Sequence, residues 1–161
     1  IRGCLGCGGC SKRGDHRCIF DDDVVNGLIE KALDADGLIV GSPVFYAGAN
    51  GALLSVLDRL FFAASSQLRF KPAAAIASAR RAGTILAVDQ INKYFQICCM
   101  PVVSSNYWPV VHGQSVEQVR QDAEGMQIMR VLGTNMAWML QATAAVPAPT
   151  VEQKIMTNFI R

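Results

Sequence analysis

Residues 41–51 constrain the fold most, because this segment joins a buried apolar run to an apolar helix. Residues 37–40, just before it, are continuously apolar rather than alternating, which is typical of a parallel strand covered on both faces. Apolar residues then recur at helical spacing, at Leu53, Leu54, Leu57, Leu60 and Phe61. The segment is therefore predicted to be a loop between a strand's carboxyl end and a helix's amino end, where open α/β sheets bind ligands.

The composition of this loop favours a flat ligand. Pro43 stiffens the turn, and Gly48 and Gly51 allow the backbone to come close to a bound group. Phe45 and Tyr46 offer ring faces for stacking. We expect a binding site here.

The rest of the chain repeats the strand and helix pattern. Residues 73–77 are predicted to form a second buried strand, and residues 101–103 a third short one. One helix is predicted between each strand and the next, and Thr84 is expected to cap the second of these helices. The order βαβαβ predicts an α/β fold with a doubly wound parallel sheet. Ser115 and Gln118 form a capping box for a long final helix whose methionines are expected to be core residues.

Composition limits the function classes. The chain has 161 residues, of which 51% are apolar and 17% charged, and we expect one domain spanning residues 1–161 with a tail at residues 147–161. A net charge of +2 with scattered Lys and Arg predicts no nucleic-acid partner. The chain lacks an apolar run of the roughly 18 residues that a membrane span needs, so we expect no membrane association and a cytoplasmic location.

The cysteine-rich loop at residues 1–20 predicts a metal or redox site. Cys4, Cys7 and Cys10 are three residues apart, and Cys18 follows after seven more residues. This spacing resembles the binding run of a [4Fe–4S] cluster. Free thiols or a disulfide, and a zinc site, remain alternatives. Cys98 and Cys99 are expected to be core residues.

Several motifs resemble the flavodoxin-like NAD(P)H-dependent FMN reductases. That family has a Gly-Ser-Pro-Val-Tyr-Tyr loop, found here as residues 41–46 with Phe45 replacing the first Tyr, and a helix ending in Leu-Asp-Arg, found here as residues 57–59. The likeness continues through residues 78–84, 100–108 and 135–138. Within the family, the iron–sulfur flavoproteins also have a compact cysteine run.

The resemblance implies a flavodoxin-like fold, FMN as cofactor, NAD(P)H as substrate and a second cofactor in the cysteine loop. The implied metal ligands are Cys4, Cys7, Cys10 and Cys18. The implied FMN-binding residues are Ser42, Pro43, Val44, Phe45, Tyr46, Asn50, Ala79, Arg80, Gly83, Thr84 and Tyr107. No catalytic side chain is expected, because the flavin carries the chemistry.

The implied function is transfer of electrons from NAD(P)H to a small acceptor or, through the cluster, to an electron-transfer protein. Relatives imply a homodimer or homotetramer. The alternative is a non-catalytic thiol or metal-binding module that has kept the scaffold and lost FMN. In similar proteins a first strand and a phosphate loop precede the cysteine run, so we expect this chain to be the incomplete record of a longer protein.

Overall fold

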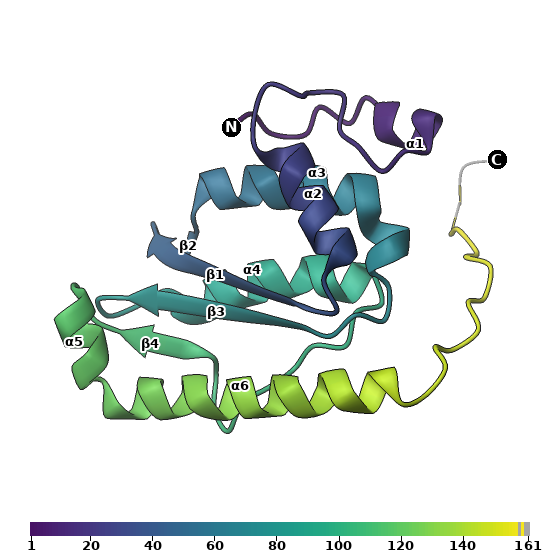
Figure 1. Cartoon of the computed structure of the whole chain (residues 1–161). Helices are drawn as coiled ribbons and strands as arrows, with labels where there is room; N and C mark the ends of the chain where they lie inside the picture. Colours follow the sequence, from purple (N-terminus) through teal and green to yellow (C-terminus); the bar gives the residue numbers. More distant parts are fainter. Residues whose placement is uncertain (158, 160–161) are drawn as a thin grey trace.

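A central sheet lies between two layers of helices in the computed structural model, which describes residues 1–157 and 159 (Figure 1). In chain order the elements are α1 (Gly9–Arg13), α2 (Val25–Asp34), β1 (Leu38–Phe45), β2 (Gly48–Ala49), α3 (Gly51–Leu68), β3 (Ala73–Ala79), α4 (Thr84–Ile97), β4 (Val110–His112), α5 (Val116–Gln121) and α6 (Ala123–Ala144).

The sheet confirms the predicted parallel α/β class. Its strand order is β2-β1-β3-β4, and both β1 with β3 and β3 with β4 are parallel pairs. Pro43 lies opposite Ser78, and Ala79 lies opposite His112, so the three parallel strands end at one edge of the sheet. The two-residue β2 folds back antiparallel to the end of β1.

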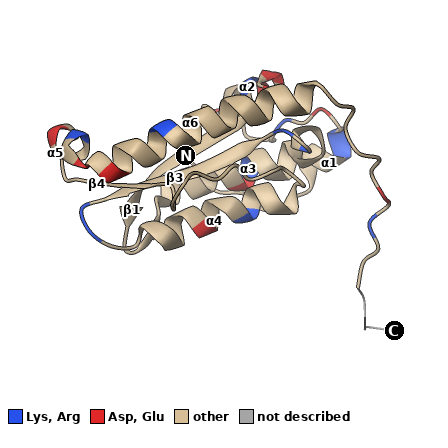
Figure 2. Cartoon of the chain, turned by 90° about the horizontal axis from the view of Figure 1, so that it is seen from below, with Lys and Arg blue, Asp and Glu red and all other residues tan. Residues whose placement is uncertain are grey.

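Strand β3 divides its small side chains between two apolar cores. Ala73, Ala75 and Ala77 belong to the larger core, which α2, α3 and α4 share with β1, whereas Ala74 packs with Leu132 and Met136 of α6. This alternation follows from the two-residue period of a strand. Helix α6 accordingly lies on one side of the sheet, with α3 and α4 on the other (Figure 2).

Two helices differ from the sequence prediction. Helix α3 does not end at Leu57-Asp58-Arg59 but continues to Leu68, so Arg59 lies in the middle of a buried helix. Ser115 caps only the short α5, by accepting a hydrogen bond from the Gln118 amide, and Asp122 caps the long α6 by accepting one from the Gly125 amide. The predicted final helix is therefore two helices.

The third strand also lies elsewhere than predicted. Residues 101–103 contribute only an isolated bridge between Val102 and Ala73, and the strand that completes the parallel sheet is β4, seven residues further along. Two short apolar pairs, at residues 102–103 and 110–111, fit a strand equally well, and only the pairing with Ala77–Ala79 of β3 selects the second.

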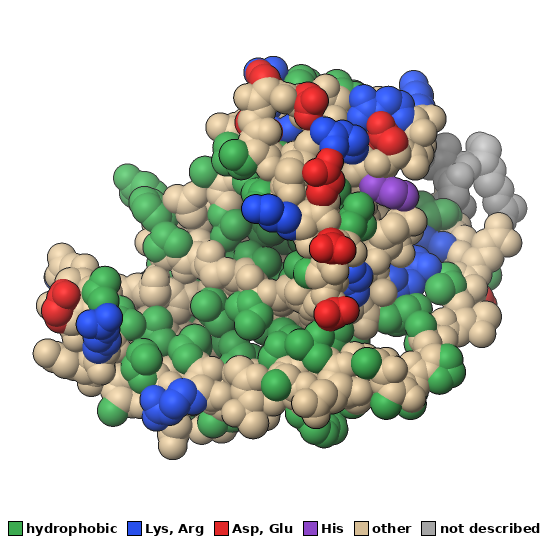
Figure 3. Space-filling model, in the orientation of Figure 1, with side chains coloured by type: hydrophobic (Ala, Val, Ile, Leu, Met, Phe, Trp, Pro, Cys, Tyr) green, Lys and Arg blue, Asp and Glu red, His purple; other side chains and the backbone are tan. Residues whose placement is uncertain are grey.

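One edge of the sheet is open along most of β1. Only Val44 and Phe45 pair with β2 on this side, and no strand of the described residues pairs with residues 38–43 there. Ile39 is half exposed beside this edge, and a cavity of about 410 Å³ lies between β1, α2 and α3. Figure 3 shows hydrophobic side chains gathered across this face of the molecule.

After α6 the chain forms no helix or strand in residues 147–157 and 159. Residues 158, 160 and 161 of the predicted tail lie outside the described residues. Among the helices of the described part, none is both long and apolar enough to cross a lipid bilayer. The division into one domain, a cysteine loop and a tail stays a prediction.

Candidate functional site

Three loops meet at the carboxyl edge of the sheet. They are the β1–α3 loop with β2, the β3–α4 loop at residues 80–83, and the turn that follows β4 at Gly113. Parallel register brings them together because Ala79 lies opposite His112 and Pro43 opposite Ser78. The structure therefore brings together both loops that the sequence predicted to bind a ligand.

Polar side chains of the β1–α3 loop hold the loop itself. The buried Ser42 hydroxyl accepts a hydrogen bond from the Asn50 amide at 2.9 Å and donates one to the Pro43 carbonyl at 2.7 Å. Asn50 Oδ1 caps α3, accepting hydrogen bonds from the amides of Ala52 and Leu53. Ser42 and Asn50 thus shape the loop, and their direct contact with a ligand stays a prediction.

A tight turn presents the aromatic rings of this loop. Tyr46 and Ala47 have φ angles of +48° and +63°, the left-handed pair that a two-residue hairpin needs. The Tyr46 side chain is fully exposed and that of Phe45 half exposed, so both rings are free to stack. Gly48 and Gly51 lie outside this left-handed pair, since neither has a positive φ, and their close approach to a ligand stays a prediction. A Cβ at Gly48 would meet Gln90, which accepts the Ala49 amide at 2.8 Å.

The β3–α4 loop touches this turn. Gly83 has a φ of +88°, and a Cβ there would lie 2.6 Å from Ala47 Cα and 2.9 Å from Val44 Cγ1. Gly83, not Thr84, is the N-cap residue of α4, and Thr84 is the buried first residue of the helix. Arg80 is exposed, and it forms no ion pair with another described residue.

Because the third strand is β4, Tyr107 lies before a strand rather than after one. Tyr107 and Trp108 are half exposed, with ring centroids 4.6 Å apart, at the β4 side of the sheet. The strand end that joins the site carries His112 instead, a residue that the sequence analysis did not select. The Asp122 carboxylate accepts the His112 amide at 2.7 Å, so the start of α6 is tied to this strand end.

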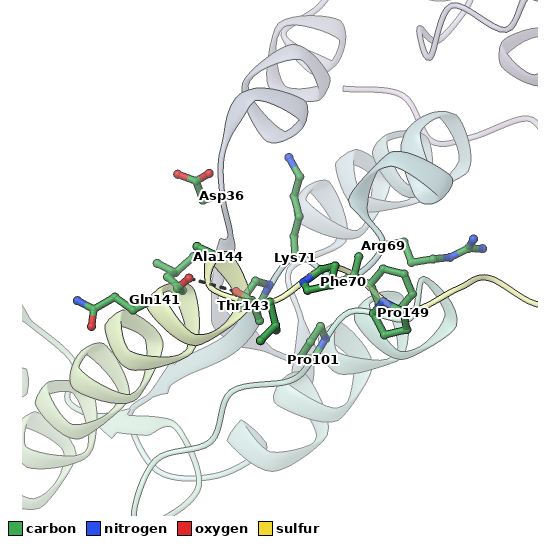
Figure 4. A pocket seen from close by; sticks show the side chains of 14 residues that line it. Asp36, Arg69, Phe70, Lys71, Pro101, Gln141, Thr143, Ala144 and Pro149 are labelled. Carbon is green, nitrogen blue, oxygen red and sulfur yellow. Dashed lines mark hydrogen bonds between the residues drawn. The ribbon is translucent and has the colours of Figure 1, made fainter.

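Two cavities lie near the ends of the strands. A cavity of about 190 Å³ opens beside the carboxyl edge, lined by residues of β1 and β3 that include Pro43 and Ser78 and by Val111 of β4. A larger cavity of about 770 Å³ lies at the opposite, amino edge, between the end of α6 and residues 146–149 (Figure 4). There Lys71 donates to the carbonyls of Leu33 and Ala35 at the end of α2, so its charge serves that helix end.

The cysteine loop brings its four predicted ligands together. Cys4, Cys7, Cys10 and Cys18 all line one cavity of about 20 Å³ next to α3. All four are free thiols, as are Cys98, which is buried, and Cys99, which is exposed. Exposed Cys99 contradicts the prediction of a core residue, because it follows the end of α4 and points away from the core. Within the described residues no three His, Cys, Asp or Glu side chains form a ready-made sphere for one metal ion.

A buried arginine lies under this cavity. Arg59 of α3 is 1% exposed and lines the same cavity as the four cysteines. Its Nη1 pairs with Asp23 Oδ2 at 2.5 Å, and its Nε donates to Cys18 Sγ at 3.2 Å. The Arg59 hydrogen bond keeps the pKa of Asp23 below its usual value.

A buried asparagine fixes the main chain of Cys18. Asn26 of α2 accepts the Cys18 amide at 2.8 Å and donates to the Cys18 carbonyl at 3.1 Å. It also donates to the Phe20 carbonyl at 3.0 Å. The sequence indicated Arg59 only as part of a family motif, because its partners Cys18 and Asp23 lie 41 and 36 residues away along the chain. Asn26 was not predicted either, although Cys18 is only eight residues away.

Comparisons with known proteins identify the family of the chain. The sequence profile described as NADPH-dependent FMN reductase matches residues 5–115. An iron–sulfur flavoprotein of Methanocaldococcus jannaschii is 33% identical over 143 residues, covering 83% of this chain and 72% of the relative. A second one from that organism is 29% identical over 144 residues, covering 81% and 71%.

A solved structure supports the fold alone. The flavodiiron core of Flv1 from Synechocystis superposes with a TM-score of 0.56 at 16% identity, over 76% of this chain and 27% of that one. The profile match begins just after Cys4 and runs in one continuous stretch through the other three cysteines of the loop and through β1, α3, β3, α4 and β4. The chain therefore belongs to the NADPH-dependent FMN reductase family of oxidoreductases.

Proposed function

We propose that this chain is an FMN-dependent oxidoreductase that takes electrons from NAD(P)H and passes them through a [4Fe–4S] cluster to a redox partner. Transfer to a small acceptor is the corresponding reaction without the cluster. The single observation that carries the proposal is the cavity that all four cysteines line, because a flavin site alone does not require four thiols in one place.

The residues at the carboxyl edge fit the ring of FMN. The exposed rings of Phe45 and Tyr46 offer faces for stacking, and they project from a loop that touches Gly83. Arg80 lies on the adjacent loop and supplies positive charge, which favours the anionic reduced ring. FMN, when bound, supplies hydride acceptance from a nicotinamide. The protein's part is to orient the ring and the nicotinamide donor.

The cysteine loop fits an iron–sulfur cluster by its donor set. Four thiols around one cavity match the four ligands of such a cluster. Gly6 and Gly8 have φ angles of +62° and +68°, which allow the loop to turn tightly between the first three cysteines. The proposal includes a cytoplasmic location, where thiols stay reduced, and a homodimer or homotetramer as the working form.

The first experiment measures both cofactors in the same sample. The chain is purified without oxygen, and FMN, iron and sulfide are quantified together with the absorbance spectrum. We expect FMN together with iron and sulfide in equal amounts, four of each for one [4Fe–4S] cluster. A folded preparation that binds neither FMN nor iron after reconstitution would contradict the proposal.

Single Cys→Ser variants show which thiols bind iron. Cys4→Ser, Cys7→Ser, Cys10→Ser and Cys18→Ser are each expected to lose most of the iron and keep FMN, because the two sites use different loops. Cys99→Ser is the matched control, since this exposed thiol lies outside the cysteine cavity. Equal iron loss in the control would show that the loss does not report ligation.

The electron path is tested by kinetics. NADH and NADPH are each mixed with the anaerobic protein, and reduction of the flavin is followed by its loss of absorbance. Electron transfer from the reduced protein is then measured with ferricyanide as acceptor and afterwards with benzoquinone. We expect flavin reduction by at least one nicotinamide, with electrons reaching the one-electron acceptor ferricyanide more slowly in Cys18→Ser. Unchanged ferricyanide reduction in that variant would favour direct transfer to small acceptors.

A further inference from the structure

The side chain of Arg59 is locked by four partners beneath the cysteine cavity. Its Nε donates to Cys18 Sγ at 3.2 Å, and its Nη1 donates to Asp23 Oδ2 at 2.5 Å and to the Arg2 carbonyl at 3.3 Å. Its Nη2 donates to the Phe20 carbonyl at 3.0 Å. Because the guanidinium is a rigid planar fork, three oxygen partners fix the direction in which Nε points. That direction is the sulfur of Cys18.

Two aromatic contacts support the same position. Arg59 Cζ lies 5.4 Å from the centre of the Phe20 ring, and Arg2 Cζ lies 4.5 Å from it. Phe20 itself lines the cysteine cavity. Both guanidinium groups are close enough to the ring for cation–π attraction. Arg2 and Arg59 therefore both help to hold Phe20 in its place in the cavity wall.

Cys18 is held differently from the other three cysteines. Cys4 Sγ accepts a hydrogen bond only from the Gly6 amide of its own turn, at 3.4 Å, and Cys10 Sγ makes a long contact of 3.8 Å with the Phe62 carbonyl. Cys18 has its main chain bound on both sides by Asn26 and its sulfur bound by a buried cation. It is the ligand that this chain positions most firmly.

We infer that Arg59 is a positioning residue of the iron–sulfur site, which aims Cys18 at the cluster and raises the cluster's reduction potential through the Nε–H···Sγ hydrogen bond. This inference rests on the proposed function, because it requires the four cysteines to hold a cluster. Reduction adds one electron, and therefore negative charge, to the iron and sulfur atoms. A donor fixed on a ligand sulfur is bound more strongly in that reduced state. The positive charge of Arg59 is balanced by Asp23, so the directed hydrogen bond remains as its specific contribution.

The test compares Arg59→Met, Arg59→Lys and a control, Arg69→Met, in the full chain reconstituted without oxygen. Arg69 is the C-cap residue of the same helix, lies outside the cysteine cavity and is half buried. Midpoint potentials are measured by dithionite titration with spectroscopic detection, and iron retention is measured during a challenge with a chelator. We expect a more negative potential and at least tenfold faster iron loss in Arg59→Met. Arg59→Lys is expected to lie between, and Arg69→Met to match the unmodified chain.

The outcomes separate this inference from the proposed function. A chain that takes up no iron and sulfide refutes the cluster and this inference with it. A chain that takes up the cluster, with unchanged potential and iron loss in Arg59→Met, overturns the role of Arg59 alone.

A second measurement decides the matter if Arg59→Met does not fold. The Arg59 Nε–H signal of the cluster-free chain is assigned by nuclear magnetic resonance. It is expected to move in Cys18→Ala and to stay in place in Cys7→Ala, whereas equal signals in both variants would overturn the inference.

Discussion

At the scale of single residues, Gly83 is the point where the two loops that are predicted to bind a ligand touch. We expect Gly83→Ala to lower the free energy of unfolding by roughly 1–3 kcal/mol, because a Cβ there meets Ala47 and the φ of +88° strains any other residue. FMN affinity should fall as well. Denaturant titration and flavin fluorescence measure the two effects.

The matched control for this prediction is Gly27→Ala in α2. Gly27 lies inside the helix, and a Cβ there meets nothing within 4 Å, so alanine should stabilise the chain by up to about 1 kcal/mol. Equal effects of the two substitutions would show that the contact between the loops has no energetic weight.

Asn50 joins the binding loop to the start of α3. Asn50→Ala removes an N-cap side chain that accepts hydrogen bonds from two backbone amides. We expect the free energy of unfolding to fall by about 1 kcal/mol, as measured by denaturant titration. Asn50→Asp keeps a capping oxygen and should be close to the unmodified chain. If the aspartate variant loses as much as the alanine variant, Asn50 acts through something other than the cap.

The grouping of the four cysteines was predictable from the sequence, whereas the residues that hold Cys18 in place were not. Four thiols at close spacing can be recognised locally, and the structure gathers them around one cavity. Arg59 and Asn26 could not be found in this way, since Arg59 lies 41 residues from Cys18 along the chain. Only the fold brings α3 and α2 beneath the loop. An arginine within an apolar helical stretch was the one visible signal.

At the scale of elements, Asp122 ties β4 to α6. Its carboxylate accepts the amides of Gly125 and His112, and these hydrogen bonds lower its pKa. A lowered pKa in the folded state contributes stability that is present above the unfolded value of about 3.9 and disappears as the pH falls through the folded value.

Asp122→Asn tests this contribution. We expect the variant to be less stable than the unmodified chain at pH 7 and the difference to shrink below about pH 4, since the unmodified carboxyl group then becomes neutral as well. Thermal unfolding measured from pH 7 to pH 3 follows the difference. A gap that does not change with pH would assign the effect to packing.

Boundaries of elements were harder to predict than their types. Helix α3 continues nine residues past Arg59, because residues 60, 61, 64 and 68 supply further buried positions that the motif ending in Leu-Asp-Arg does not include. The third strand was misplaced, so Tyr107 precedes a strand and His112 stands at the strand end, while a contact of Tyr107 with FMN stays a prediction. Local pattern cannot distinguish two short apolar pairs when partner strands decide between them.

At the scale of the whole molecule, the parallel sheet was predictable because two of its strands are continuous apolar runs. Ile39 lies half exposed beside the unpaired edge of β1. We expect the chain to self-associate through this edge at high concentration. Ile39→Lys should weaken the association, because a lysine on an exposed edge strand opposes pairing with another strand. Sedimentation velocity measures the degree of association, with Ile85→Lys on α4 as control. Identical behaviour of the two variants would place the contact elsewhere.

The same edge is where a further strand can pair with the sheet. On the far side, β4 offers only three residues for pairing, whereas residues 38–43 present six in a row. Any long strand that extends this sheet, whether from the same polypeptide or from another, must therefore dock alongside β1, directly beneath the turn that carries Tyr46. A strand added there would then also border the proposed FMN site.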